Sequence, residues 1–366
     1  MTRTCVLLFL FWFCGPLAGP ARCQETRQPA ERAVWKLMRH DSAASLRGLH
    51  VVDNQVIWTS GSGGTVLRSI DGGQTWERVS PTGGDNLDFR DIHAFDAERA
   101  VVVSAGAPAR VYVTADGGRC WQRVHEDRRE PVFFDAMDFD ANGNGVLFSD
   151  PVNGRLLLVV SNDGGRSWQE LERPRQPETL PAEAGFAASG SCLCQQDGRW
   201  IIGLGGGSAD DPPRPARLLM TDDRGGHWTA VDTPLPAGPA SGIFSVAFAN
   251  RDHGVLVGGT YTEPDNPRGN AAWTSDGGNH WYVPQTPPAG YRSGVAVRPT
   301  PDGFQMVCVG PGGSDLSVDG GQTWQPLDDT GFHAVDFSDE GTLGVASGAD
   351  GRIGVWRQAD SPQPGR

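Results

Sequence analysis

The sequence predicts an all-β fold, a seven-bladed β-propeller formed by one domain, and three observations predict it. An eight-residue pattern, Ser/Thr-x-Asp-x-Gly-x-x-Trp, occurs six times. The tryptophans of successive copies are 45, 47, 60, 53 and 43 residues apart, and one four-stranded propeller blade takes roughly 40 to 50 residues. The two ends of the repeat region hold the parts of one further blade. Six copies of the pattern therefore predict seven blades.

The repeated pattern, called the Asp box below, is expected to fix a tight β-hairpin. Its hydroxyl and carboxylate can accept hydrogen bonds from turn N–H groups, and its Gly supplies a positive φ. The Trp can cover the base of the hairpin while its N–H finds a turn carbonyl. The Asp and Trp positions are Asp71 and Trp76, Asp116 and Trp121, Asp163 and Trp168, Asp223 and Trp228, Asp276 and Trp281, and Asp319 and Trp324.

Two short β-rich runs precede each box, and two further strands flank the box itself. Each blade therefore has four strands, called a to d from the axis outward. The predicted blades cover residues 45–80, 88–125, 131–173, 183–232, 241–286 and 291–328. Residues 331–356 supply three strands of blade seven without a box, and residues 33–38 supply the fourth. Pairing the two ends closes the ring and removes open sheet edges. The domain is thus expected over 33–357, with a disordered tail over 358–366.

Residues 1–23 are typical of a secretory signal peptide. Arg3 precedes an apolar run from Cys5 to Cys14 that is too short to span a membrane, and small residues follow near Ala18 to Ala21. Arg22 before Cys23 disfavours lipid attachment. We therefore expect cleavage between about Ala21 and Gln24 and an extracytoplasmic product, periplasmic or secreted, with a retained anchor as the less favoured alternative.

The composition narrows the classes of partner. The net charge of -13 argues against nucleic acid and anionic lipid as partners.

The cysteines indicate neither a disulfide nor a metal site. Cys192 and Cys194 lie on one strand and cannot easily bridge each other, and neither His nor a second Cys pair stands at ligand spacing. We expect no metal site and no dependence on disulfides. Proline-rich stretches lengthen the third and fourth repeats. Nothing in the sequence marks a second domain. We expect the protein to be a monomer.

The starts of the innermost strands carry the sharpest functional signal. They read SLRGLH, DFRDIH, FFDAMDF, FAASGS, GIFSVAF, GYRSGV and GFHAVDF. Alignment on the leading apolar residue places five polar residues toward the axis: Arg47, Arg90, Asp135, Arg292 and His333. Blades six, seven, one and two are neighbours in the ring. Three arginines and a histidine are therefore expected on one side of the axis.

Two interpretations of this arginine cluster stay open. A guanidinium presents a planar fork of donors that suits a carboxylate or phosphate, so the cluster can bind an anionic ligand or an acidic protein segment. Alternatively, Arg47 and Arg90 pair with Asp91 and Asp135 and only fill the axis. Loop residues Asp150, Glu183, Tyr261, Tyr291 and Asp315 could add acid and base groups nearby, although an isolated loop carboxylate is more often a turn cap.

The chain resembles a known family in these motifs. The six Asp boxes look like the bacterial neuraminidase repeat. LRGL, DFRDI and the closing GFHAVDF with GRIGVW resemble the photosystem II stability and assembly factors and their exported bacterial relatives, over about residues 33–357. The resemblance implies a non-catalytic, extracytoplasmic propeller without cofactor, which contacts a partner through an axial arginine patch. Arg47, Arg90 and, less securely, Arg292 match that patch. Blades four and five are longer than the family pattern.

Two enzyme classes are the alternatives. In a sialidase-like glycosidase, Arg47, Arg90 and Arg292 would hold a substrate carboxylate, Tyr261 or Tyr291 would be the nucleophile and Glu183 its base, with Asp150 a further catalytic candidate. The Arg-Ile-Pro motif of sialidases is missing, since Arg352-Ile353 is followed by Gly354. For an oxidoreductase, the glycines of 203–207 do not form a dinucleotide motif before a helix, and no Cys-x-x-Cys-His is present.

Overall fold

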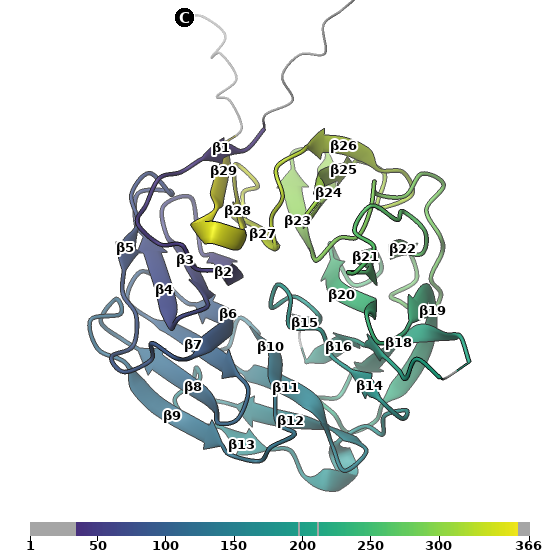
Figure 1. The fold of residues 1–366 in the computed structure, drawn as a ribbon, viewed down its shortest axis with the longest axis horizontal. Helices are drawn as coiled ribbons and strands as arrows, with labels where there is room; N and C mark the ends of the chain where they lie inside the picture. Colours follow the sequence, from purple (N-terminus) through teal and green to yellow (C-terminus); the bar gives the residue numbers. More distant parts are fainter. Residues whose placement is uncertain (1–33, 197, 211, 358–366) are drawn as a thin grey trace, which may run out of the picture. The chain divides into compact units, whose positions relative to one another are not determined.

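The computed structural model describes residues 34–196, 198–210 and 212–357. The described residues belong to one compact unit. This unit contains seven antiparallel sheets arranged as a ring (Figure 1). Its innermost strands contact one another in the order β2, β6, β10, β15, β20, β23 and β27, and β27 returns to β2. The predicted seven-bladed propeller is confirmed.

Blades one to three have the predicted order of strands, each paired with the next along the chain. Blade one contains β2 (Leu46–Val51), β3 (Ile57–Gly61), β4 (Thr65–Ser69) and β5 (Glu77–Arg78). Blade two contains β6 (Asp88–Ala94), β7 (Ala100–Ala105), β8 (Ala109–Thr114) and β9 (Gln122–Asp127). Blade three contains β10 (Phe134–Phe139), β11 (Gly145–Val152), β12 (Arg155–Ser161) and β13 (Gln169–Glu170), and the short 3-10 helix η1 (Arg173–Arg175) follows.

Blades four and five differ from the prediction where their repeats are longest. Blade four contains β15 (Leu193–Gln196), β16 (Arg199–Gly203), β18 (Arg214–Thr221) and β19 (Thr229–Ala237). Its innermost strand therefore begins at Leu193, and the expected start at residues 186–191 is wrong. Blade five contains β20 (Ser241–Phe248), β21 (Gly254–Thr260) and β22 (Ala271–Thr274), and two short strands from blade four, β14 (Glu183–Ala184) and β17 (Gly205–Gly206), extend its sheet.

Blade seven joins the two ends of the described chain. Blade six contains β23 (Gly294–Thr300), β24 (Gly303–Gly310), β25 (Gly313–Ser317) and β26 (Gln325–Asp328). Blade seven contains β27 (Ala334–Phe337), β28 (Leu343–Ser347) and β29 (Ile353–Arg357), with the 3-10 helix η2 (Ala349–Gly351) before β29. Its outer strand is β1 (Lys36–Leu37), which pairs antiparallel with β29. The expected closure of the ring is confirmed.

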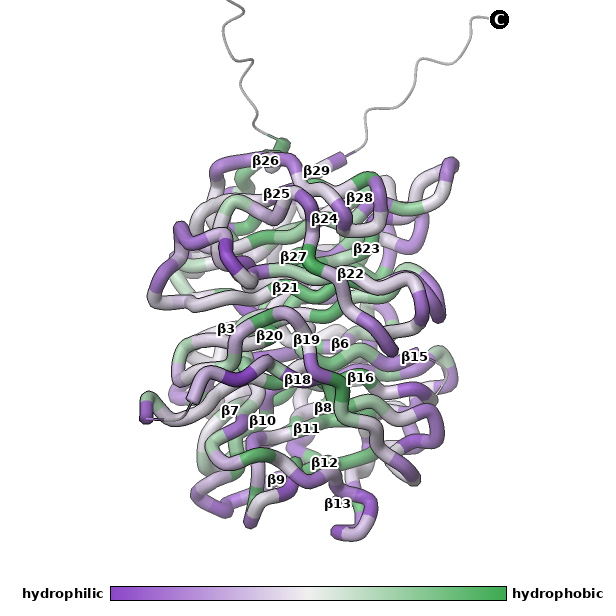
Figure 2. The backbone as a smooth tube through the Cα atoms, turned by 90° about the vertical axis from the view of Figure 1, so that its right-hand side faces the viewer, coloured by the Kyte–Doolittle hydropathy of each residue, from purple (hydrophilic) through white to green (hydrophobic). Residues whose placement is uncertain are grey.

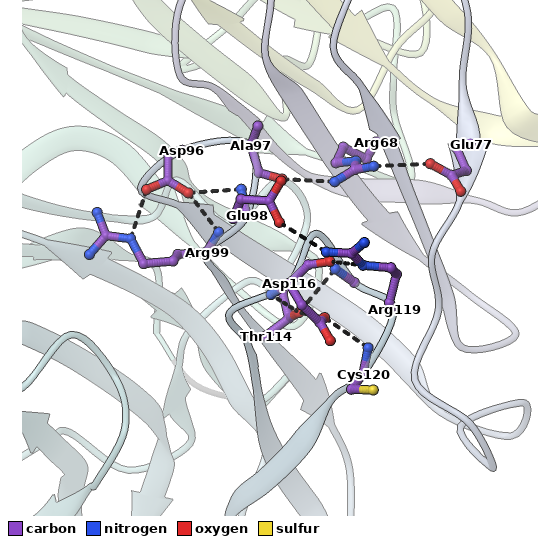
Figure 3. Close-up of polar contacts among 11 residues, drawn as sticks. Arg68, Glu77, Asp96, Ala97, Glu98, Arg99, Thr114, Asp116, Arg119 and Cys120 are labelled. Carbon is purple, nitrogen blue, oxygen red and sulfur yellow. Dashed lines mark hydrogen bonds and ion pairs between the residues drawn. The ribbon is translucent and has the colours of Figure 1, made fainter.

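The Asp boxes form the expected hydrogen bonds. In blade one, the Ser69 hydroxyl accepts from the Gly73 N–H at 2.8 Å and donates to Asp71 at 2.8 Å. The Asp71 carboxylate also accepts from the Thr75 N–H at 2.9 Å. The same bond to the hydroxyl recurs in the other five boxes. Figure 3 shows the box of blade two, where Cys120 takes the place of Thr75.

Two boxes are not self-contained, which corrects one detail of the prediction. Four of the box tryptophans donate to a carbonyl of their own turn, as Trp76 does to Gly73 at 3.2 Å. Trp121 instead donates to the Val79 carbonyl at 2.6 Å, and Trp228 donates to the Arg175 carbonyl at 2.8 Å. Both carbonyls belong to segments that follow the preceding blade. These two boxes therefore also connect neighbouring blades.

The core lies between the blades. Seven apolar clusters each combine side chains of two neighbouring blades, as where Leu46 of blade one packs with Val345 of blade seven. Figure 2 shows apolar stretches within the strands and hydrophilic residues in the loops. Polar side chains of the inner strands accept hydrogen bonds from backbone N–H groups of the next blade. These pairs are Asp336 with Val51, His50 with Ala94, Asp91 with Met137, Asp138 with Gln195, and Ser245 with Val295.

The structure describes only some of the other features that the sequence predicts. The signal peptide over 1–23 and the tail over 358–366 lie outside the described residues. Cys120, Cys192, Cys194 and Cys308 are free thiols. Among the residues described, no helix is long and apolar enough to cross a membrane, and no group of three His, Cys, Asp or Glu is placed to hold a metal ion.

Trp35 is the main anchor of the closing strand. Its ring is 3% exposed and packs edge-on against Phe332 at 5.7 Å and Trp356 at 5.8 Å. Its indole N–H donates to the Ser314 hydroxyl at 3.1 Å, and its backbone N–H donates to the Asp328 carboxylate at 3.2 Å. Residues just before β1 therefore tie blade seven to blade six.

We predict that Trp35→Ala lowers the free energy of unfolding by about 3–5 kcal/mol, because it empties a buried site at the ring closure. Leu37→Ala, at a position that is 54% exposed in the same strand, should cost less than about 1 kcal/mol. Urea unfolding followed by circular dichroism measures both. Equal losses in the two variants would contradict the assignment of Trp35 as the anchor.

Candidate functional site

The inner strands carry β-bulges that aim specific side chains at the axis. In blade one, Leu46 pairs with Gly61 and Gly48 pairs with Ser60, so Arg47 has no partner in the ladder. The same shift occurs in three other blades. A bulge bends the strand and redirects the extra side chain. The bulged residues are Arg47, Arg90, Asp135 and Phe244, which occupy equivalent positions in blades one, two, three and five.

Residues 186–191, called the axial segment below, cross this end of the ring. The carbonyls of Ala187 and Ala188 accept from Arg90 at 2.8 Å and from Arg47 at 3.4 Å. On the other side, the Ser189 hydroxyl donates to the Ser293 carbonyl at 2.7 Å. The segment thereby contacts blades one, two and six. The residues that were predicted to begin blade four instead lie across the axis.

Gly190 allows the axial segment to pass close to blade two. Its φ is +72°, and a Cβ atom there would clash with an Asp91 carboxylate oxygen. Glycine adopts this left-handed conformation without a steric penalty, whereas other residues resist it. The small side chains of this segment, AASGS over 187–191, thus match the space that they occupy.

Three of the bulged residues, Arg47, Arg90 and Phe244, border one recess together with the axial segment, and this recess is called the axial pocket below. It has a volume of about 320 Å³, at the small end of the range for ligand sites. Its lining residues come from the axial segment and from blades one, two, five, six and seven. They are Arg47, Arg90, Phe186, Ala187, Ala188, Phe244, Tyr261, Tyr291, Ser293, Pro311 and His333.

One side of the axial pocket is cationic. Arg90 is paired with Asp88, with its Nη2 at 2.7 Å from the carboxylate. Arg47 is half-buried and forms no ion pair within the described part of the chain, and its hydrogen-bond partner is the Ala188 carbonyl. Burial and then the neighbouring Arg90 lower the pKa of Arg47. The pocket therefore holds one guanidinium charge that no carboxylate in contact balances.

His333 lies on the same side and is neutral at pH 7. Burial, and then the positive charge of Arg47, lower its pKa to about 4. Its Nε2 is 3.2 Å from the Ser45 hydroxyl. The imidazole can therefore offer a hydrogen bond in the pocket without adding a charge.

The other side of the axial pocket is aromatic. Phe186 and Phe244 stack with ring centroids 4.1 Å apart. Tyr291 meets Phe244 edge-on at 4.8 Å, and Tyr261 meets it edge-on at 6.3 Å. Phe244, Tyr291 and Ala188 form an apolar cluster of their own, with Phe186 packed against it. Burial raises the pKa of Tyr291, so its hydroxyl stays protonated.

Arg292, which was predicted to join the arginine cluster, lies outside the axial pocket. It is 2% exposed and pairs with Asp315, which is 1% exposed, at 2.7 Å from Nε and 2.5 Å from Nη2. Its Nη1 donates to the Tyr291 carbonyl at 3.0 Å. Arg292 precedes β23 and sits in no bulge, so its side chain is free to turn away from the axis. The structure thus brings together two of the three arginines.

The predicted axial carboxylates are buried beside the pocket. Asp91 is 5% exposed and accepts the N–H groups of Ile92 at 2.8 Å and Met137 at 2.7 Å. Asp135 is 1% exposed, and burial together with the nearby Asp150 raises its pKa well above the usual value. Neither carboxylate forms an ion pair among the described residues, so the pairs considered with Arg47 and Arg90 are not present.

The remaining enzyme candidates are separated or already paired. Glu183 is 4% exposed and accepts two hydrogen bonds from Arg217, at 2.8 and 2.6 Å. Asp150 accepts the Gly185 N–H at 3.0 Å, and burial raises its pKa to about 6. Neither lines the axial pocket, whereas Tyr261 and Tyr291 do. The pocket can therefore bind an anionic group beside an apolar one, and the described residues that line it include no paired nucleophile and carboxylate base.

The sequence analysis named Tyr261 and Tyr291 but missed the other two aromatic residues of the pocket, Phe186 and Phe244. Phe244 follows Ile243 as Arg47 follows Leu46, so it stands at the aligned position, where the prediction counted only polar residues. Phe186 was assigned to an inner strand instead of to a segment across the axis. The signal for Phe244 was present in the alignment, whereas no local sequence pattern distinguishes the axial segment from an inner strand.

Comparison with known families supports the resemblance that the sequence carries. A family model described as "Photosynthesis system II assembly factor YCF48" matches residues 27–133. This match includes β2 and β6 with Arg47 and Arg90, and it covers less than half of the chain. The predicted resemblance to the photosystem II assembly factors is confirmed. No curated protein matches the chain by sequence.

Solved structures share the propeller fold. "YCF48 bound to D1 peptide" has a TM-score of 0.60 and 17% identity, and the match covers 89% of this chain and 96% of that one. YCF48 from Cyanidioschyzon merolae has a TM-score of 0.60 and 18% identity, with 89% and 99% covered. The WD40 domain of Neurospora crassa Pan2 has a TM-score of 0.59 and 14% identity, with 91% and 98% covered. At these identities the likeness establishes the fold.

We predict that Arg292 supports stability and not binding. Arg292→Met leaves Asp315 as an unpaired buried carboxylate, so the free energy of unfolding should fall by about 3–5 kcal/mol. The double variant Arg292→Met with Asp315→Leu should recover most of that loss, because neither charge remains buried. Urea unfolding of the single and double variants measures the coupling. A single variant as stable as the wild type would contradict this role.

Proposed function

We propose that this propeller is a non-catalytic binding protein that holds an acidic segment of a protein partner in its axial pocket, in the manner of an assembly or stability factor. The observation that carries the proposal is the half-buried Arg47 guanidinium, which borders the pocket with a single carbonyl contact of 3.4 Å. A carboxylate placed there would gain charge-assisted hydrogen bonds in a partly desolvated site.

The comparisons support a protein segment as the ligand. The family match covers the blades that supply Arg47 and Arg90, and one related propeller is described as bound to a D1 peptide. A peptide carboxylate has the negative charge and the acceptor oxygens that suit the cationic side of this pocket. The proposal for this chain concerns an acidic peptide segment and names no particular partner.

The glycosidase alternative has less support. Its base, Glu183, is held by Arg217 on both oxygens, and the third arginine of its substrate clamp, Arg292, is paired with Asp315. The oxidoreductase alternative has no observation in its favour. We therefore retain the binding function as the proposal.

We predict that Arg47→Ala weakens the binding of acidic peptides about ten- to hundredfold, the loss expected when a charged hydrogen-bond donor is removed. The probes are fluorescent dodecapeptides with two adjacent Glu or Asp residues, measured by anisotropy against their Gln and Asn counterparts. Wild-type affinity should fall as salt is raised, because the site is open to solvent.

Arg119→Ala is the matched control for this measurement. Arg119 has a side chain that is 75% exposed and lies in the Asp box of blade two, where it is 3.6 Å from Glu98 (Figure 3). Its removal changes the net charge by the same amount and should leave peptide affinity unchanged. Equal affinities of wild type and a folded Arg47→Ala variant for acidic peptides would overturn the proposal.

We also propose that the protein works outside the cytoplasm, because residues 1–23 have the composition of a signal peptide. When the full chain is expressed in a Gram-negative host, the periplasmic fraction should contain a shortened product whose first residue lies within 22–24. Mass spectrometry of the intact product measures this. A cytoplasmic product that retains residues 1–23 would contradict export.

A further inference from the structure

We infer that the axial pocket selects an acidic residue that stands next to an aromatic or large apolar side chain, with Tyr261 as the residue that determines this preference. The inference rests on the proposed binding of an acidic segment and adds the chemistry of the neighbouring residue. Its basis is the division of the pocket into a cationic side and an aromatic side, which come from different blades.

The two sides meet at the axial segment. Arg47 and Arg90 reach the carbonyls of Ala188 and Ala187, and Phe186 of the same segment stacks on Phe244. A group bound beside Arg47 therefore has an apolar wall next to it, within a recess of about 320 Å³. So small a volume suits a carboxylate and one adjacent side chain better than a long stretch of peptide.

Tyr261 differs from the other aromatic residues of the wall in its exposure. Phe244 is 3% exposed and Tyr291 is 6% exposed, whereas Tyr261 is 49% exposed. Its ring meets Phe244 edge-on, at 76° between the planes. The buried rings give the wall its support, and Tyr261 leaves ring surface available to a ligand. Aromatic pairs prefer such offset or edge-on contacts.

The backbone around Tyr261 is held in place. Its N–H donates to the Ala240 carbonyl at 3.0 Å, and the Glu263 N–H donates to the Thr260 carbonyl at 3.0 Å. The Tyr291 N–H donates to the Pro264 carbonyl at 2.9 Å, which ties the loop to another aromatic residue of the wall. Because the wall is already ordered in the free protein, less conformational entropy is lost when a ligand binds.

Acidic residues in the loop that follows Tyr261 favour one orientation of the ligand. Glu263 and Asp265 belong to the loop that begins with Tyr261. An Asp265 oxygen is 3.9 Å from the point where a Cβ on Gly312 would lie, beside the pocket residue Pro311. Like charges repel, so the ligand carboxylate is directed toward Arg47 and its apolar neighbour toward Tyr261.

The test uses short fluorescent peptides with acetylated and amidated ends, so that terminal charges do not contribute. Three peptides share one flanking sequence and carry Glu-Phe, Glu-Ala or Gln-Phe at the centre. Wild type should bind Glu-Phe about two- to tenfold more tightly than Glu-Ala, the range expected for one aromatic contact. Gln-Phe should bind weakly, because it cannot pair with Arg47.

Variants then assign the preference to one ring. Tyr261→Ala should bind Glu-Phe and Glu-Ala equally, and Tyr261→Phe should keep the wild-type preference. Tyr282→Ala is the matched control, since Tyr282 is also 49% exposed but lies outside the pocket, and it should keep the preference too. Unfolding curves confirm that each variant is folded.

The outcomes separate this inference from the proposed function. If wild type binds Glu-Phe and Glu-Ala equally while Arg47→Ala weakens both, the acidic site stands and the aromatic preference is overturned. If the preference persists in Tyr261→Ala, the assignment to Tyr261 is overturned. If neither Glu peptide binds better than Gln-Phe and Arg47→Ala has no effect, the proposed function fails and this inference fails with it.

Discussion

The β-bulges of the innermost strands are the constraint on which the axial pocket depends. In a regular ladder, alternate side chains enter the cores between blades, and those cores are apolar. A bulge adds one residue that has no partner across the ladder and turns its side chain out of that alternation. Arg47, Arg90 and Phe244 reach the pocket in this way. Blade six has no such bulge, and its arginine is buried against Asp315.

The axial segment changes what these bulged residues can do. Its carbonyls take one donor each from Arg90, at 2.8 Å, and from Arg47, in a longer contact of 3.4 Å. Phe186 of the same segment completes the aromatic wall. The segment thus orients the cations without neutralising them, because a carbonyl carries no charge. A bound carboxylate would meet donors that are already positioned, which lowers the cost of ordering them on binding.

The sequence was sufficient for the fold because each Asp box is a local structure. The hydrogen bonds of its hydroxyl and carboxylate join residues two to four apart, so six copies are visible without any knowledge of long-range contacts. The site was only partly predictable. Alignment of strand starts found Arg47, Arg90 and His333, whereas the partners of Glu183 and Arg292 lie 34 and 23 residues away. The start of blade four was misplaced because AASGS has the small residues of an inner strand but crosses the axis.

The electrostatics of Arg47 distinguish the axial pocket from the apolar cores between the blades. The chain has many carboxylates, with a net charge of -13, yet none in the described residues pairs with Arg47. Partial burial of a guanidinium costs free energy unless an opposite charge or several hydrogen bonds offset it. Arg292 has that compensation in Asp315, whereas Arg47 has one long contact to a carbonyl. The free protein therefore lacks a stabilising contact at Arg47 that an anionic ligand can supply on binding.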